Sequence, residues 1–76
     1  MTNHETFSTQ NLYQAAYCLC RGYKIMGFER TGGKVNVIFE GEDMTAKALE
    51  FYNGAKVDAK KYSDSYRSLK DMVFQR

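Results

Sequence analysis

Residues 23–40 read YKIMGFERTGGKVNVIFE, two runs of β-favouring residues separated by Thr31-Gly32-Gly33. Glycine adopts positive φ angles without steric cost, and tight hairpin turns require such angles. The pattern therefore predicts a two-stranded antiparallel β-hairpin, and the rest of the chain must supply the elements that cover it.

The length of the turn decides the register of this hairpin. If Gly32 and Gly33 form a two-residue loop, the facing pairs are Met26 with Phe39, Phe28 with Val37 and Arg30 with Val35. One face is then strongly apolar, whereas the second face is half apolar and carries Ile25, Gly27, Ile38, Glu29, Asn36 and Glu40. A three-residue loop would mix these two sets, and the sequence leaves both registers open.

A first helix is predicted ahead of the hairpin. Ser8 is suited to be its N-cap, and Phe7 is placed to pack on Leu12 as a hydrophobic staple. Apolar residues then recur at helical spacing, and Gly22 follows where a left-handed C-cap is expected. The helix should therefore run from about Ser8 to just before Gly22.

Two further helices are predicted after the hairpin. Asp43 is suited to cap a short second helix that Asn53-Gly54 closes, and Asp58 is suited to cap a third. The predicted order is α-β-β-α-α, with residues 1–6 as a flexible N-terminal tail and residues 7–76 as a single domain. The fold class is therefore α+β, a small domain in which the two-stranded hairpin packs against helices.

The composition indicates one small intracellular domain. The 76 residues have room for a single hydrophobic core, and a hydrophobic content of 43% is too high for a disordered chain. No apolar run reaches the roughly 18 residues that a membrane span needs, and residues 1–7 lack the blocks of a signal peptide. We therefore expect a cytoplasmic protein whose two cysteines are reduced.

No residue pattern in the chain indicates catalysis or metal binding. Cys18 and Cys20 point to nearly opposite sides of a helix and have no neighbouring ligand pair, so we expect them to pack as small apolar residues. His4 is the single histidine and falls in the predicted tail. Gly32-Gly33-Lys34 joins two strands and does not open a helix, unlike a phosphate-binding loop. We therefore expect neither an enzyme nor a cofactor.

Two kinds of surface remain as candidates for binding. The half-apolar face and the two open edges of a hairpin favour a homodimer, with the residues Ile25, Ile38, Tyr62 and Tyr66 as a self-association or partner surface. A mildly basic third helix and the loop before it offer a possible nucleic-acid contact, formed by Lys56, Lys60, Lys61, Arg67 and Lys70. Asp64 and Asp71 interrupt that basic stripe, which favours a solvated face.

Several short motifs resemble those of an uncharacterised family. They are Phe7-Ser8-Thr9, Asn11-Leu12-Tyr13, Ala15-Ala16-Tyr17, Gly22-Tyr23-Lys24, Gly27-Phe28-Glu29-Arg30, Val37-Ile38-Phe39-Glu40, Tyr52-Asn53-Gly54 and Leu69-Lys70. Together they are similar to short prokaryotic and phage proteins grouped as domain of unknown function 5659. The resemblance implies a compact α/β domain and an origin in a mobile element, and it transfers no catalytic residue, cofactor or substrate.

These observations lead to one main functional expectation and two alternatives. The main one is a non-enzymatic protein-interaction module that self-associates or binds another protein, without membrane or small-molecule substrate. The first alternative is an accessory nucleic-acid-binding or regulatory protein that uses the basic third helix. The second is an enzyme site completed only in an oligomer, with Tyr13 or Tyr17 beside Glu50 as its candidate residues.

Overall fold

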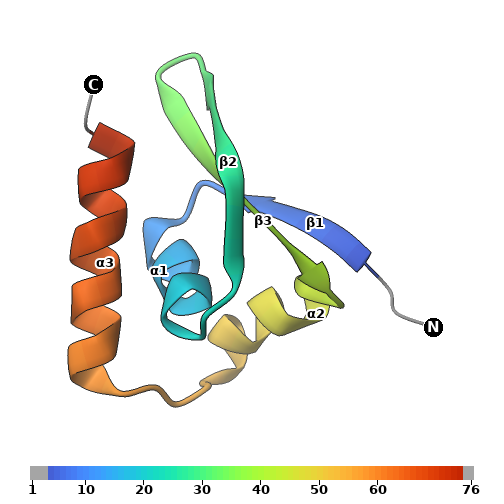
Figure 1. Ribbon diagram of the computed structural model, residues 1–76, viewed down its shortest axis with the longest axis vertical. Coiled ribbons are helices and arrows are strands. Elements are labelled where there is room, and N and C mark those ends of the chain that lie inside the picture. The colour runs from blue at the N-terminus through green and yellow to red at the C-terminus, as the bar shows by residue number, and fades with distance from the viewer. Residues whose placement is uncertain (1–3, 75–76) are drawn as a thin grey trace.

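In the computed structural model, which describes residues 4–74, helices cover one face of an antiparallel β-sheet (Figure 1). Along the chain the elements are β1 (His4–Thr9), α1 (Leu12–Cys20), β2 (Lys24–Thr31), β3 (Lys34–Glu42), α2 (Met44–Leu49), the 3-10 helix η1 (Glu50–Asn53) and α3 (Ala59–Phe74). The predicted α+β class is confirmed, as is the packing of the hairpin against helices.

The hairpin of β2 and β3 forms the centre and one edge of the sheet. Its turn consists of Gly32 and Gly33, whose φ angles are 55° and 82°. Positive φ at both positions is the geometry of the two-residue turn that suits the twist of a hairpin. The predicted pairing is confirmed next to the turn, where Arg30 faces Val35 and Phe28 faces Val37.

A β-bulge at Met26 changes the register farther from the turn. Ile25 faces Phe39 and Gly27 faces Ile38, so Met26 has no partner of its own on β3. The prediction that Met26 lies opposite Phe39 is therefore wrong. The extra residue lets Ile25 pack against the core while Met26 stays 57% exposed.

Residues 4–6 belong to a strand, which corrects the prediction of a flexible tail over residues 1–6; residues 1–3 lie outside the described part. β1 pairs antiparallel with β3, and the strand order is β1-β3-β2. Phe7 faces Phe39 and packs on the core, so it is not a helical staple. Alternating side chains of β1 can therefore line the core, which a helix beginning at Ser8 would prevent.

The first helix begins later than predicted because Asn11, not Ser8, is its N-cap. Asn11 Oδ1 accepts hydrogen bonds from the backbone N–H groups of Tyr13 at 3.0 Å and Gln14 at 3.4 Å. The predicted end at Gly22 is confirmed. Gly22 has a φ of 87°, and the N–H of Tyr23 donates to Cys18 O at 3.0 Å, as in a Schellman motif.

The later helices begin and end close to the predicted residues. Asp58 caps α3, because its Oδ1 accepts from the N–H of Lys61 at 3.0 Å. Gly54 closes η1 with a φ of 76°. Asp43 precedes α2 as predicted, but it adopts a left-handed φ of 52° and its side chain makes no capping hydrogen bond. The cap at Asp43 is therefore one of position and not of side-chain chemistry.

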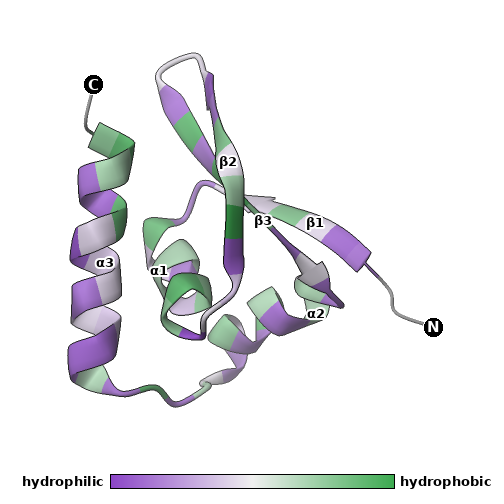
Figure 2. Cartoon of the chain, viewed as in Figure 1, coloured by the Kyte–Doolittle hydropathy of each residue, from purple (hydrophilic) through white to green (hydrophobic). Residues whose placement is uncertain are grey.

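The core lies between the inner face of the sheet and the helices. Buried side chains come from α1, β3, α2 and α3, and Tyr17, Phe39, Met44 and Leu69 are the largest of them. α3 packs mainly on α1. Figure 2 shows hydrophilic colours along much of α3, as expected for an amphipathic helix with one solvated side. No helix within residues 4–74 is long and apolar enough to cross a membrane.

Candidate interaction surfaces

Together with β1 on the opposite side, β2 is one of the two edge strands of the sheet. Within residues 4–74 it pairs with β3 alone, whereas β1 covers the other side of β3. The hairpin therefore has one open edge of its own and not the two expected from a lone hairpin. An open edge presents unpaired backbone N–H and C=O groups, which can pair with another strand.

The turn identifies which residues of β2 point these groups outward. Thr31 and Lys34 flank the two-residue turn, so they form a hydrogen-bonded pair. Hydrogen-bonded and non-hydrogen-bonded pairs alternate along an antiparallel ladder. Phe28 and Arg30 consequently direct their backbone groups toward the open edge.

Of the two residues whose backbone groups point toward the open edge, Phe28 has the large apolar side chain. Its partner Val37 is fully buried on the inner face, but Phe28 itself remains 38% exposed because no strand of the described residues 4–74 covers it from the edge side. Arg30 lies two residues after Phe28 on the same face of β2. Its Nη2 donates a hydrogen bond to Val73 O of α3. This bond ties the end of α3 to β2 and fixes the orientation of the edge.

Ile25 and Ile38 do not form a common surface. Ile25 faces Phe39 on the inner side and packs against the core, whereas Ile38 faces Ser8 and Gly27 on the outer side. The bulge at Met26 causes this separation. The half-apolar second face expected from an unbroken register is thus reduced, and Ile38 is half-buried between its neighbours.

Tyr62 and Tyr66 are occupied within the chain. The Tyr62 hydroxyl donates to Tyr13 O at 2.9 Å, and the Tyr66 ring stacks on the Tyr13 ring at 5.2 Å between centroids. Both residues pack against the core. They therefore join α3 to α1, and the most exposed member of this cluster is Tyr13, which is 58% exposed.

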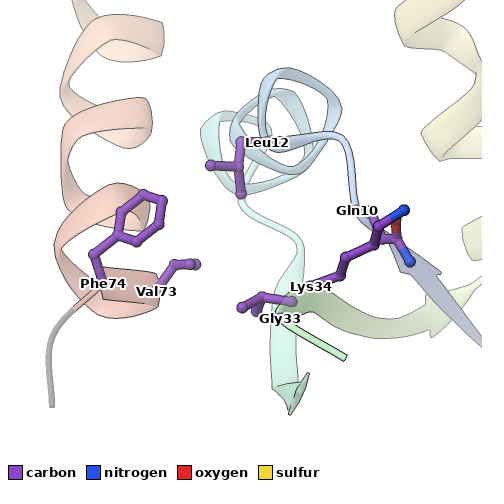
Figure 3. Close-up of a pocket in the computed structure, with 7 residues that line it drawn as sticks. Gln10, Leu12, Gly33, Lys34, Val73 and Phe74 are labelled. Atoms are coloured by element: carbon purple, nitrogen blue, oxygen red, sulfur yellow. The ribbon is translucent and has the colours of Figure 1, made fainter. Parts of the chain in front are cut away.

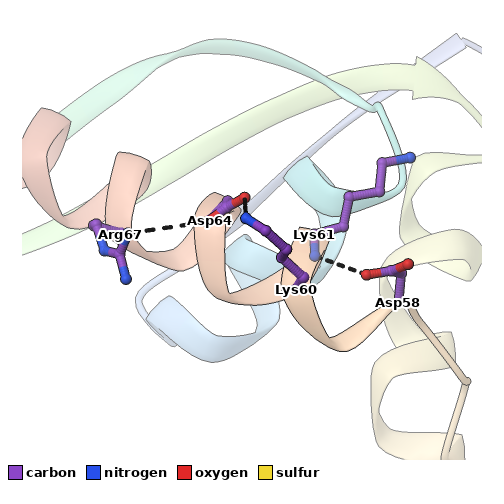
Figure 4. A network of polar contacts seen from close by, with 5 residues as sticks. All are labelled: Asp58, Lys60, Lys61, Asp64 and Arg67. Carbon is purple, nitrogen blue, oxygen red and sulfur yellow. Dashed lines mark hydrogen bonds and ion pairs between the residues drawn. The ribbon is translucent and has the colours of Figure 1, made fainter.

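Acidic side chains lie among the basic residues that were predicted to contact nucleic acid, as Asp64 does beside Lys60 and Arg67. The Asp64 carboxylate forms an ion pair with Lys60 Nζ at 3.1 Å and lies 4.0 Å from Arg67 Nη1 (Figure 4). It therefore balances part of the charge of both side chains. Lys61 extends away from both in that view. Of the others, Lys70 lies over the Tyr66 ring at 5.6 Å and Lys56 lies in the loop before α3.

The candidate residues for an oligomer-completed enzyme site are only partly together. The Tyr17 hydroxyl donates to Glu50 Oε1 at 3.0 Å, whereas Tyr13 stacks on Tyr66 instead. Burial, reinforced by the bond to Glu50, raises the pKa of Tyr17 to about 12. A phenol that is 2% exposed and stays protonated at neutral pH is suited to a structural contact rather than to proton transfer.

Both cysteines are buried thiols. Cys18 is fully buried, and burial raises its pKa to about 12, which suppresses the reactive thiolate. Cys20 is 8% exposed. Across residues 4–74 no group of three or more His, Cys, Asp or Glu side chains is arranged to hold a metal ion.

A family model described as Domain of unknown function (DUF5659) matches residues 4–75. The chain belongs to this family. The match covers all the motifs that carry the resemblance, from Phe7 to Lys70, and it includes all of β1. The DUF5659 description names no activity, ligand or partner. No curated protein and no solved structure matches the chain.

Proposed function

We propose that this DUF5659 domain is a non-enzymatic protein-interaction module that self-associates as a homodimer through the open edge of β2. The observation that supports this most directly is the edge position of Phe28. Its backbone groups point outward and the residue is 38% exposed, although its partner on β3 belongs to the core. A second β2 strand alongside would pair the backbone and cover the ring together.

A two-fold axis restricts how two copies of β2 can pair. In an antiparallel pair related by such an axis, one residue lies opposite its own copy. The regular segment after the bulge offers Phe28, Glu29 and Arg30 as central residues. Like charges placed directly opposite are destabilising, which disfavours centres at Glu29 and Arg30. Phe28 is the remaining centre.

The register centred on Phe28 is also favoured by its contacts. The two phenyl rings would face each other on the inner side of the combined sheet, and aromatic cross-strand pairs are stabilising. Glu29 would lie opposite Gly27 of the second copy, which places no side chain against its carboxylate. The joined sheet would be continuous across both copies, with the helices of each copy on the same side.

The bulge at Met26 limits the length of this interface. A bulge twists and bends an edge strand, and in this register Arg30 lies opposite Met26 of the second copy. Regular pairing is therefore restricted to the residues from Gly27 to Glu29. A short interface of this kind gives a reversible dimer and not an open-ended fibre, because a two-fold contact closes on itself. The dimer should therefore dissociate on dilution.

Sedimentation equilibrium over a wide concentration range tests the proposal. We expect a monomer–dimer equilibrium that changes little with salt, and a Phe28→Ser variant that stays monomeric. Leu49→Ser is the matched control, since Leu49 is 47% exposed and lies on α2, whose most extensive contact with the sheet is with β1 and not with β2. A wild-type protein that remains monomeric at high concentration, or a Phe28→Ser variant that dimerises equally well, would contradict the proposal.

A further inference from the structure

A pocket of about 220 Å³ opens between the hairpin turn, the β1–α1 connection and the C-terminal end of α3 (Figure 3). Its walls come from Leu12, Val35, Val73, Phe74, Gln10 and Lys34. These residues are far apart in the sequence, and the Arg30 bond to Val73 O holds the end of α3 against the hairpin. The pocket is thus a product of tertiary packing that no local motif indicates.

One end of the pocket is apolar. Val73 is 2% exposed and Leu12 and Val35 are half-buried, so they form a fixed wall. Phe74 lies at the rim and is 63% exposed. An apolar group placed among these side chains would remove the Phe74 ring from water, which is favourable.

The opposite end is polar and carries a positive charge. In Figure 3 the side chain of Lys34 extends toward Gln10, away from Leu12 and Phe74. Among the described residues 4–74, those that line the pocket include no acidic side chain. Within residues 4–74, neither the Lys34 ammonium nor the Gln10 amide has a hydrogen-bond or ion-pair partner, whereas Lys60 is paired with Asp64.

The volume limits the size of the occupant. Pockets for drug-sized ligands and cofactors measure about 300–1,000 Å³, so this one is suited to a single side chain with a small polar group attached. An apolar side chain and a carboxylate on the same carbon atom satisfy both ends in the least space. The C-terminal residue of a peptide chain has this chemistry, and capture of such termini is a known recognition mode.

We infer that this pocket binds the C-terminus of a partner protein whose last residue is apolar. The apolar side chain lies against Leu12, Val73 and Phe74, and the terminal carboxylate accepts hydrogen bonds from the Lys34 ammonium and the Gln10 amide. This site shares no residue with the regular edge segment from Gly27 to Glu29, so its occupation does not depend on dimer formation.

Nuclear magnetic resonance titration with three tetrapeptides, each acetylated at its N-terminus, tests the inference. The first ends in leucine with a free carboxylate, the second is the same peptide with a C-terminal amide, and the third ends in glycine with a free carboxylate. We expect saturable shifts of the Lys34, Val35 and Phe74 amide signals with the first peptide, with a dissociation constant on the order of 1 mM. The other two should bind at least about threefold more weakly.

Variants separate the two ends of the pocket. Lys34→Gln should lower the affinity for the leucine peptide with a free carboxylate until it equals the affinity for the leucine amide, because only the charge-assisted bond is lost. Phe74→Ala should lower the affinities for both leucine peptides by the same factor. Lys24→Gln is the matched control, since Lys24 is an exposed lysine at the far end of β2 and should leave every affinity unchanged.

Several outcomes would overturn the inference. They are equal affinity for the leucine carboxylate and its amide, the same loss in Lys24→Gln as in Lys34→Gln, and shifts that never saturate or that map outside the pocket. The titration is repeated in Phe28→Ser. Binding there with unchanged affinity supports a site independent of the dimer, while loss of binding in that variant alone would show that the peptide occupies the β2 edge instead.

Discussion

The Tyr17 hydroxyl donates a hydrogen bond of 3.0 Å to Glu50 Oε1 and thereby joins the middle of α1 to the first residue of η1. Tyr17 is 2% exposed, whereas Glu50 lies at the surface. The bond requires a protonated phenol, since a phenolate would have no hydrogen to donate and would repel the carboxylate. The folded state therefore favours the neutral form of Tyr17.

This preference makes stability depend on alkaline pH. Burial and the Glu50 bond raise the pKa of Tyr17 from 10.0 to about 12. The contribution of Tyr17 is fully present below pH 10.0 and is lost as the pH rises through about 12, because the unfolded phenol releases its proton first. Urea unfolding at several pH values should show a smaller alkaline loss of stability in Tyr17→Phe than in the wild type.

The comparison is made as a difference between the two proteins, which removes the effects of the other tyrosines. Below pH 10.0, Tyr17→Phe should cost about 1 kcal/mol, the usual net value of one hydrogen bond. Parallel pH profiles for the two proteins would show that Tyr17 is not the group responsible.

The hairpin and the ends of the helices could be predicted because their signals are local. Gly32 and Gly33 require the turn wherever the strands lie, and Gly22 and Asp58 act on backbone groups within a few residues. β1 could not be predicted in this way. It is stabilised by pairing with β3, such as His4 with Glu42, and residues so far apart give no periodic signal in one sequence.

The candidate interaction surface was partly mispredicted for a related reason. The bulge at Met26 depends on whether Ile25 or Met26 packs better against the core, which is decided by α1 and β3 together. A strict alternation places Ile25 beside Ile38, whereas the structure separates them. The role of Phe28 at the edge likewise depends on β1 occupying the other side of β3.

The buried Gln14 side chain links three elements. Its Oε1 accepts from Thr9 Oγ1 at 2.9 Å, and its Nε2 donates to Ala48 O at 3.0 Å. Gln14→Leu should lower the free energy of unfolding by about 1–3 kcal/mol, because the Thr9 hydroxyl would lose its buried acceptor. Chemical denaturation monitored by circular dichroism measures the change.

Gln10→Leu is the control for this substitution, since Gln10 is exposed one residue beyond β1. Changes at such surface positions usually stay within about 0.5 kcal/mol. If both leucine variants lost the same stability, the buried bonds of Gln14 would not be the cause.

Cys18 offers a probe of global unfolding. It is fully buried, and burial raises its pKa to about 12, so the native thiol is both inaccessible and protonated. In Cys20→Ala, where Cys18 is the single cysteine, alkylation by iodoacetamide should be slow under native conditions and should accelerate in urea along the unfolding curve. Rapid labelling of a protein that keeps its native spectrum would indicate local opening of α1.

Disulfide trapping can test the Phe28-centred register. Facing residues in a hydrogen-bonded antiparallel pair have Cα atoms about 5.5 Å apart, within the range of about 4.4–6.8 Å that a disulfide spans. In this register each Glu29 lies diagonally from its copy at about 7–8 Å. Phe28→Cys should therefore form covalent dimers under mild oxidation, whereas Glu29→Cys should form few.

The native cysteines provide the same background in both variants, since Cys18 and Cys20 are buried. Non-reducing electrophoresis with increasing protein dilution measures the yield, and trapping that depends on a reversible dimer must fall as the protein is diluted. Faster trapping of Glu29→Cys would move the two-fold axis to Glu29. In that arrangement two carboxylates face each other, so dimerisation of the wild type would strengthen as added salt screens their repulsion, and the salt-insensitive association expected here would be wrong.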